Sequence, residues 1–344
     1  MSTSAQYLSP SEAAERLGVS AKALRLYEQR GLIKPIRTAA GWRTYGPVEM
    51  ARAAEIVALR ALGLSLAQVA RVLQGDPQGL EPALAAHQVA LEDRIRRLAD
   101  TVGKVRSLRA DLARGQAPAA EDLARLVRPA GEVRVGFELP WPWGGERFEL
   151  HDVRPLNYII GPLGSGKTRL ARAIAENLPE AIFISLDRLA DGGAEAKARM
   201  DADPALKSRV EQTLTWLVQD GAAVSPALAT LVVVLESEGP TTLVVDMVEQ
   251  GLDHATQEAL IACLRRREPG APALFLLTRS SAILDLAAVG PTEAIILCPA
   301  NHSPPTQVAP YPGAPGYEAV ATCLASPEVR ARTEGVVAIR REVA

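Results

Sequence analysis

The stretch "GPLGSGKT" at residues 161–168 decides the fold of the second half of the chain. It matches the phosphate-loop pattern G-x-x-x-x-G-K-[ST] at every position. The apolar run "PLNYII" precedes it, and "RLARAIAENL", with the spacing of an amphipathic helix, follows it. A glycine loop between a strand and a helix lets backbone N–H groups at the helix N-terminus hold phosphate. The sequence therefore predicts an α/β nucleotide-binding domain.

The motif assigns roles to individual residues. Lys167 is expected to reach the β and γ oxygens of ATP, and Thr168 is expected to bind Mg²⁺. A second ligand for Mg²⁺ is expected after another apolar strand, and "TTLVVDMVEQGLD" at 241–253 supplies it as Asp246. An aromatic side chain before the loop is expected to stack on the base, and the sequence does not choose among Phe137, Trp141, Trp143 and Phe148. The full set of expected nucleotide contacts is Gly161, Pro162, Leu163, Gly164, Ser165, Gly166, Lys167, Thr168 and Arg169.

The segment around Asp246 resembles the ABC-type ATPase pattern, in which a strand ends in D-E-P and the chain continues to G-L-D. "ALFLLTRSS" at 273–281 is similar to the strand that precedes the switch histidine of that family. The resemblance covers roughly residues 132–300, and it implies an ABC-type fold whose two protomers sandwich the nucleotide. It further implies contacts from the opposite protomer by Asp253 and by Ser225, which lies in the degenerate signature "VSPAL".

The departures from that pattern concern cleavage of the nucleotide. Met247 stands where an ABC ATPase has the glutamate that polarises water, and Arg279 stands at the switch position. A thioether takes no proton at pH 7, and a general base typically supplies a factor of about 10²–10⁴ in rate. Glu249 lies two residues beyond the position of the missing base. The sequence therefore predicts that ATP binds as a signal and is hydrolysed slowly or not at all.

The first third of the chain has a different pattern. "SPSEAAERLGVSAKALRLYEQRGLI" at 9–33 predicts two short helices joined by a tight turn, with Ser9 and Ser20 as N-caps. "IKPIRTAAGWRTY" at 33–45 suits a β-hairpin wing, and two further helices are expected at 47–62 and 65–73. A helix pair of this kind is compatible with DNA binding, although many such pairs bind no DNA.

This order of helix pair, wing and second helix pair resembles the MerR family of transcriptional regulators over residues 5–75. The resemblance implies a winged helix–turn–helix that binds palindromic promoter DNA and acts on RNA polymerase indirectly, by distorting the promoter. Ser20, Lys22 and Arg25 would then face the major groove. The residues that the resemblance places on DNA phosphates are Tyr27, Arg43 and Tyr45.

A long amphipathic segment follows at 83–115. Its apolar residues, with Gln88 and Arg109 as polar members of the stripe, follow one another in steps near 3 and 4, which predicts a coiled-coil seam. The MerR resemblance implies an antiparallel dimerisation helix at this place. The alternative is a helix that packs on its own domain. The seam residues are Leu84, Leu91, Ile95, Leu98, Val102, Val105 and Leu112.

The sequence thus predicts a multidomain protein. An all-α winged helix–turn–helix at 1–78 and a dimerisation helix at 79–115 precede a linker at 116–131 and an ABC-type α/β P-loop domain at 132–344. Residues 1–115 hold 17 Lys and Arg against 11 Asp and Glu, and the rest holds 21 against 29, so only the first third suits a polyanion. The predicted function is a homodimeric DNA-binding regulator with ATP and Mg²⁺ as its signal.

Other functions stay open at this point. Asp187 follows the strand-like "AIFIS", as in small-molecule kinases, so a P-loop kinase or ATPase with a fused autoregulatory DNA-binding domain is the main alternative. Met247 disfavours a DNA-repair or transport ATPase. The segment 116–129 has no cysteine, which disfavours a thiolate metal sensor. The longest apolar run, at 228–235, is far shorter than the roughly 20 residues of a membrane helix, so a cytoplasmic location without membrane contact is expected.

Overall fold

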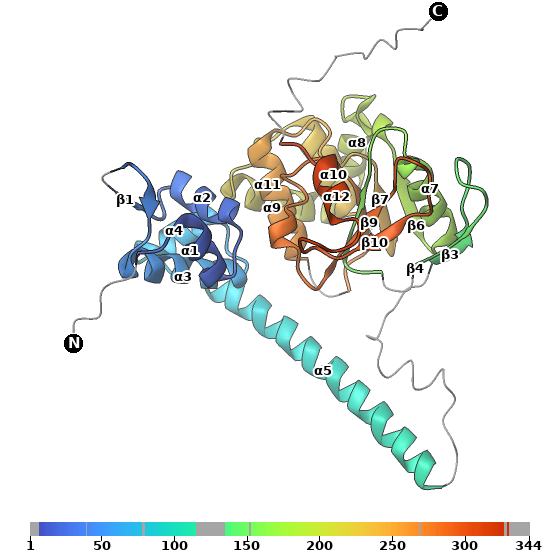
Figure 1. Ribbon diagram of the computed structural model, residues 1–344, viewed down its shortest axis with the longest axis horizontal. Helices are drawn as coiled ribbons and strands as arrows, with labels where there is room; N and C mark the ends of the chain where they lie inside the picture. The colour runs from blue at the N-terminus through green and yellow to red at the C-terminus, as the bar shows by residue number, and fades with distance from the viewer. Residues whose placement is uncertain are drawn as a thin grey trace, which may run out of the picture. The chain divides into compact units, whose positions relative to one another are not determined.

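The computed structural model describes residues 7–38, 40–77, 80–114, 135–150, 153–267 and 270–326, together with residue 329. These residues form two compact units, one helical and N-terminal, the other built around a six-stranded sheet (Figure 1). This confirms the predicted multidomain architecture. The predicted linker at 116–131 lies outside the described residues. Within the described ranges, no helix is both long and apolar enough to cross a bilayer.

The N-terminal unit begins with the predicted helix pair. Helix α1 (Pro10–Leu17) starts with a capping box between Ser9 and Glu12 and ends at Gly18, whose φ of 65° is left-handed. Helix α2 (Ala21–Gln29) starts at the N-cap Ser20. The capping residues read from the sequence therefore set both helix starts, because each cap satisfies backbone N–H groups that the first turn leaves unpaired.

The rest of this unit also follows the prediction. Strands β1 (Ile36–Arg37) and β2 (Arg43–Thr44) pair antiparallel and form the wing. Helices α3 (Pro47–Ala61) and α4 (Leu66–Leu73) come next. The largest side chains of the shared core are Leu24, Tyr27, Tyr45, Ile56 and Leu64.

Helix α5 (Leu80–Ala113) is a single helix of 34 residues. Its first turn packs Leu80 and Ala83 on the core of the N-terminal unit. Beyond that turn, the predicted seam is exposed: six of its apolar side chains are 37–64 % accessible, and the side chain of Leu98 lies outside the description. These six are Leu84, Leu91, Ile95, Val102, Val105 and Leu112.

The second unit contains the predicted α/β domain. A hairpin of β3 (Val135–Glu138) and β4 (Arg147–Leu150) precedes the sheet. The six strands lie in the order β10-β9-β5-β8-β7-β6, and all are parallel except β10. Their bounds are β5 Leu156–Ile160, β6 Ala181–Ile184, β7 Thr242–Val245, β8 Ala273–Leu277, β9 Glu293–Leu297 and β10 Thr306–Val308.

Helices cover both faces of this sheet, which is why β5 and β7 are buried along their whole length. Helix α7 (Lys167–Asn177) packs on β5 to β8. On the other face, Leu156, Tyr158 and Ile160 join one apolar cluster with residues of the helices that follow. Those elements are η1 (Leu186–Leu189), α8 (Ala194–Ala202), α9 (Pro204–Gln219), α10 (Pro226–Leu235) and α11 (His254–Arg265), and the short η2 (Leu286–Ala288) and α12 (Tyr317–Cys323) lie later in the chain.

Candidate functional site

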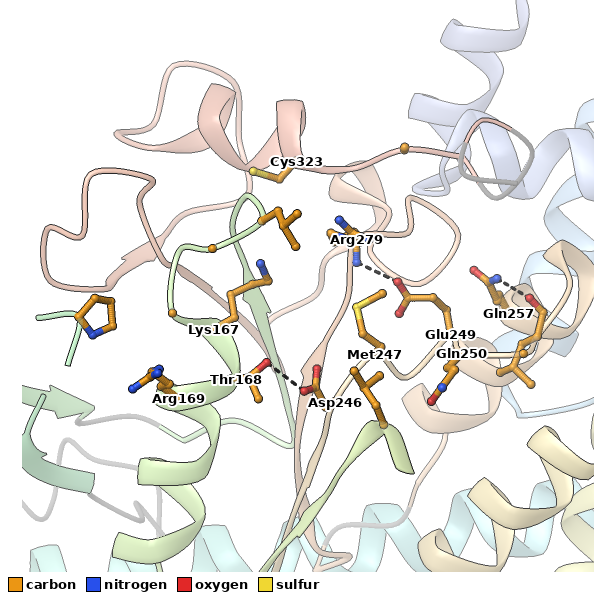
Figure 2. Close-up of a pocket in the computed structure, with 18 of the residues that line it drawn as sticks. Lys167, Thr168, Arg169, Asp246, Met247, Glu249, Gln250, Gln257, Arg279 and Cys323 are labelled. Carbon is orange, nitrogen blue, oxygen red and sulfur yellow. Dashed lines mark hydrogen bonds between the residues drawn. The ribbon is translucent and has the colours of Figure 1, made fainter. Parts of the chain in front are cut away.

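Three loops meet at the carboxyl edge of the parallel strands, the edge at which open α/β sheets bind ligands. They follow β5, β7 and β8, and β8 lies between the other two in the sheet. A cavity of about 1300 Å³ opens among them, lined by Lys167, Asp246 and Arg279, one residue from each loop (Figure 2). Three positions that are distant in sequence are therefore brought to one site.

The phosphate loop requires glycine at two positions. A Cβ on Gly161 would lie 2.3 Å from the carbonyl oxygen of Cys298. Gly166 has a φ of 91°, and a Cβ there would lie 2.6 Å from the ring of Trp143. Gly166 is also the N-cap of α7, so the helix N-terminus faces the loop. Only glycine permits this close approach and this conformation, and the resulting cradle fits a phosphate group.

Lys167 begins α7, and its side chain folds back over the loop. The Nζ atom donates hydrogen bonds to the carbonyl oxygens of Gly161 at 2.7 Å and Pro162 at 2.6 Å. Burial lowers the pKa of Lys167, and the positive charge of Arg279 acts in the same direction. A bound phosphate would favour the charged form of this ammonium group.

Thr168 and Asp246 lie together beneath the loop. Thr168 Oγ1 donates a hydrogen bond to Asp246 Oδ2 at 3.0 Å. Burial raises the pKa of the Asp246 carboxyl, and the hydrogen bond from Thr168 and the charge of Arg188 partly offset this. A hydroxyl and a carboxylate at this separation are hard oxygen ligands, so the two residues fit Mg²⁺.

The structure separates the four aromatic candidates for base stacking. Phe137 and Phe148 are buried with their ring centres 5.4 Å apart, and Trp143 is buried against the phosphate loop. Trp141 is 70 % exposed and lines the cavity. The guanidinium of Arg169 lies 4.3 Å from the ring centre of Trp141, a cation–π contact. Of the four aromatic side chains, Trp141 is therefore the one that is exposed and lines the cavity.

Met247 lines the same cavity directly after Asp246, and its φ of 45° is left-handed. Arg188 of η1 holds this turn, because its Nη1 and Nη2 atoms donate to the carbonyl oxygens of Asp246 and Met247, each at 2.6 Å. Reasoning from the sequence missed Arg188, because its contacts join residues 58 and 59 positions apart. No local pattern signals such a pair.

The chain's C-terminal segment also reaches the cavity, which the sequence did not predict. Cys323 and Ala325 both line it, and Figure 2 shows Cys323 on the same side of the cavity as Arg279. The backbone N–H of Ala325 donates to the carbonyl oxygen of Arg279 at 2.9 Å, and the N–H of Ser281 donates to the carbonyl oxygen of Ala325 at 3.0 Å. The loop after β8 is thereby paired with this segment on one side.

Of Asp253, Ser225 and Asp187, only Asp253 lines the cavity. Asp253 lines the cavity and accepts a hydrogen bond from the N–H of Thr256 at 2.8 Å. Ser225 caps α10 and accepts from the N–H of Leu228 at 3.2 Å, but it does not line the cavity. Asp187 is exposed, its N–H donates to Ser185 Oγ at 3.1 Å, and it does not line the cavity.

The predicted DNA-reading residues of α2 and the wing lie on the N-terminal unit. Arg25 is exposed, and Lys22 is partly exposed. Ser20 is buried, and its side-chain oxygen accepts a hydrogen bond from the N–H of Ala23 at 3.1 Å, so this oxygen caps the N-terminus of α2. Arg43 of the wing forms an ion pair with Glu28 of α2 at 2.7 Å.

Two predicted phosphate contacts need correction. Tyr27 is 6 % exposed and Tyr45 is 0 % exposed, and both belong to the core. The Tyr45 hydroxyl donates to the Glu28 carboxylate, and burial raises the pKa of this hydroxyl. These rings therefore pack the domain interior, and Tyr45 joins Arg43 in fastening the wing to α2.

Comparisons with known proteins support the helix–turn–helix assignment of the N-terminal unit. A family model described as "MerR HTH family regulatory protein" matches residues 8–76. The chain is similar to the "Probable heavy metal-dependent transcriptional regulator" of Haemophilus influenzae, with 37 % identity over 102 residues. That match covers 28 % of this chain and 80 % of the relative.

Two solved structures are similar to separate parts of the chain. A MerR family regulator lacking the sensor domain, solved with promoter DNA, is 20 % identical, covers 36 % of this chain and 98 % of its own, and has a TM-score of 0.26. An ATP-binding cassette of an ABC transporter in its ADP conformation is 14 % identical, covers 60 % of this chain and 99 % of its own, and has a TM-score of 0.36. From the family model and the Haemophilus influenzae relative, the chain belongs to the MerR HTH family of regulatory proteins.

Proposed function

We propose that this protein is a homodimeric DNA-binding regulator whose sheet unit binds ATP with Mg²⁺ as a signal. The observation that carries the nucleotide half is the 3.0 Å hydrogen bond between Thr168 and Asp246 beneath a glycine cradle. Membership of the MerR HTH family supports the DNA half. Both halves belong to one chain, so a nucleotide signal and a DNA response can be linked.

Different cavity residues would hold the phosphates, the Mg²⁺ ion and the base of ATP. The backbone of residues 163–167 and the N-terminus of α7 would cradle the phosphates. Lys167 would exchange its two loop carbonyls for phosphate oxygens, and Thr168 with Asp246 would hold Mg²⁺. The metal would supply positive charge against the phosphate oxygens. Trp141 would stack on the base.

ATP serves here as a signal because the position after Asp246 carries no proton acceptor. The Met247 thioether lines the cavity at that position. Without a general base there, we expect turnover below about 1 s⁻¹, the lower end of the usual enzyme range. A bound ATP would then persist long enough to bias the state of the protein.

On the DNA side, α2 would enter the major groove and the wing would rest on the backbone. Lys22 and Arg25 would approach base edges, and Arg43 would contact phosphate from the wing. Two copies related by a two-fold axis suit a palindromic promoter. Distortion of that promoter would be the indirect route to RNA polymerase.

A second copy of α5 would form the dimer. Six apolar side chains at coiled-coil spacing are exposed on this helix, and burying them against a partner helix removes them from water. Because the helix begins on the core of the DNA-reading unit, a change in the seam alters the separation of the two α2 helices.

The experiment is to measure operator affinity and promoter output with no nucleotide, with ADP and with ATP, for the wild type and Lys167→Ala. ATP must bind two states with different affinity in order to shift them. We expect a change of about 5–150-fold in operator affinity for the wild type and no response from the variant. Equal values in all wild-type conditions would rule out the sensor role.

A P-loop kinase with a fused DNA-binding domain is not favoured. Asp187, the residue proposed to hold an acceptor substrate, is exposed and bonded to Ser185 rather than facing the cavity. No other described residue of the cavity suggests an acceptor site. Nucleotide-dependent phosphorylation of a small acceptor would revive this alternative.

A further inference from the structure

Glu249 is placed differently from what its position in the sequence suggests. It lies two residues beyond the site of the missing base, yet it lines the nucleotide cavity and is only 3 % exposed. Figure 2 shows its carboxylate directed toward Arg279. A carboxylate is therefore available to the cavity although the residue after Asp246 is a methionine.

The turn after β7 explains this placement. Met247 has a φ of 45°, a conformation that non-glycine residues rarely adopt. The N–H of Gln250 donates to the Met247 carbonyl at 2.9 Å, which closes the turn. Strained backbone of this kind persists only where the surroundings impose it, and it gathers at functional sites. Here the surroundings include Arg188, which holds the carbonyls of Asp246 and Met247 at 2.6 Å each.

A separate contact fixes the carboxylate itself. The backbone N–H of Arg279 donates to Glu249 Oε1 at 3.0 Å. Arg279 also lines the cavity, and β8, which precedes it, lies between the strand of the phosphate loop and the strand of Asp246. The carboxylate is thus held from a loop that faces the phosphate position. Positioned groups of this kind are what general-base catalysis requires.

Two other carboxylates line the described cavity. Asp246 accepts the hydrogen bond from Thr168 and would bind Mg²⁺. Asp253 accepts a hydrogen bond from the N–H of Thr256 at the start of α11. The third carboxylate among the described lining residues is Glu249, which the Arg279 N–H holds from the loop after β8.

We propose that Glu249 is the general base of a slow ATP hydrolysis that ends the nucleotide signal. The proposal rests on ATP binding as set out above. A water oxygen forms a bond to the γ-phosphorus while the bond from that phosphorus to the β–γ bridging oxygen breaks. The proton of the water passes to the Glu249 carboxylate, and the electron pair of the broken bond leaves with ADP. The proton then returns to solvent with the released phosphate, and the site keeps ADP.

The test compares the wild type with Glu249→Gln in the full-length protein. A glutamine carbonyl still accepts the hydrogen bond from Arg279, but it cannot take the proton. We expect unchanged ATP affinity by calorimetry and phosphate release at least about 100-fold slower in a single turnover, within the usual range for a general base. Mass analysis of bound nucleotide after incubation should find ADP on the wild type and ATP on the variant.

Two further variants act as controls. Glu211→Gln changes an exposed carboxylate of α9 that does not line the cavity, so it should release phosphate at the wild-type rate. Lys167→Ala should release none above background, which excludes a contaminating ATPase.

Several results would overturn the proposal. Phosphate release at the wild-type rate by Glu249→Gln would show that its carboxylate accepts no proton. Loss of ATP affinity together with phosphate release would assign the side chain a structural role. Wild-type protein that binds ATP and never converts it would refute the base while leaving the sensor intact, whereas failure to bind ATP would refute both.

Discussion

Thr168 and Asp246 are 78 positions apart in sequence, and a 3.0 Å hydrogen bond joins their side-chain oxygens. Thr168 lies in the first turn of the helix after β5 and Asp246 directly follows β7, with β8 between the two strands. The sheet therefore fixes their separation before any ligand arrives. Preorganisation of this kind reduces the cost of binding, because little of the site has to be ordered by the ligand.

This pair should make ATP binding depend on Mg²⁺. In Thr168→Ala, the increase in ATP affinity on adding Mg²⁺ should fall by at least about 10-fold, because one oxygen ligand is lost. Calorimetry with Mg²⁺ and with a chelator measures the difference. Thr168→Ser keeps the hydroxyl and should behave like the wild type, and an equal Mg²⁺ effect in the alanine variant would show that Thr168 binds no metal.

Trp141 should contribute to ATP affinity only through its contact with the base. Stacking of a base on an aromatic side chain is worth about 1–3 kcal/mol, so Trp141→Ala should weaken ATP binding by about 5–150-fold. Inorganic triphosphate has no base, and its affinity for the same variant should be unchanged. If both ligands weaken equally, the exposed ring supports the phosphate loop instead.

Helix α5 should control the oligomeric state. Ile95 and Val102 are 64 % and 47 % exposed on the seam, so the double variant Ile95→Glu, Val102→Glu would bury two like charges in a dimer. Sedimentation velocity should show a monomer for this variant. Ser107→Glu adds a charge on the same helix outside the seam and should leave a dimer. A dimeric double variant would place the contact elsewhere.

Arg25 should contribute to sequence-specific DNA binding. It is exposed on α2, and loss of one side chain that reads a base edge costs about 1–3 kcal/mol. Arg25→Ala should therefore lose affinity for the operator but little for random DNA, as measured by fluorescence anisotropy. Arg30, at the C-terminal end of α2, is the matched control. Equal losses on both DNAs would make Arg25 a phosphate contact.

Local patterns predicted most of the architecture. The Ser9–Glu12 capping box, the Ser20 cap and the glycine loop each act within a few residues, so the sequence shows them directly. The sequence also predicted an acidic residue at Asp246, because an acidic residue at the end of an apolar strand is a local pattern. The hydrogen bond between Thr168 and Asp246 then follows from the order of the strands in the sheet.

Long-range packing accounts for what was missed. Tyr45 was assigned to phosphate by resemblance, but its burial depends on how α2 and the wing close over one core. Glu249 was set aside by its position along the chain, and only the left-handed turn at Met247 directs it to the cavity. Arg188 and Ala325 reach the site from other elements, and no spacing rule links them to it.

The position of Ala325 in the wall of the cavity has a consequence for synthesis on the ribosome. The helix–turn–helix core is complete once the first turn of α5 has emerged, whereas the cavity wall includes Ala325. Domains generally fold in the order in which they are made. Each new molecule therefore passes through a stage in which its helix–turn–helix is formed and its cavity is not. Chains interrupted in that interval would carry a folded N-terminal unit with no means of receiving the signal.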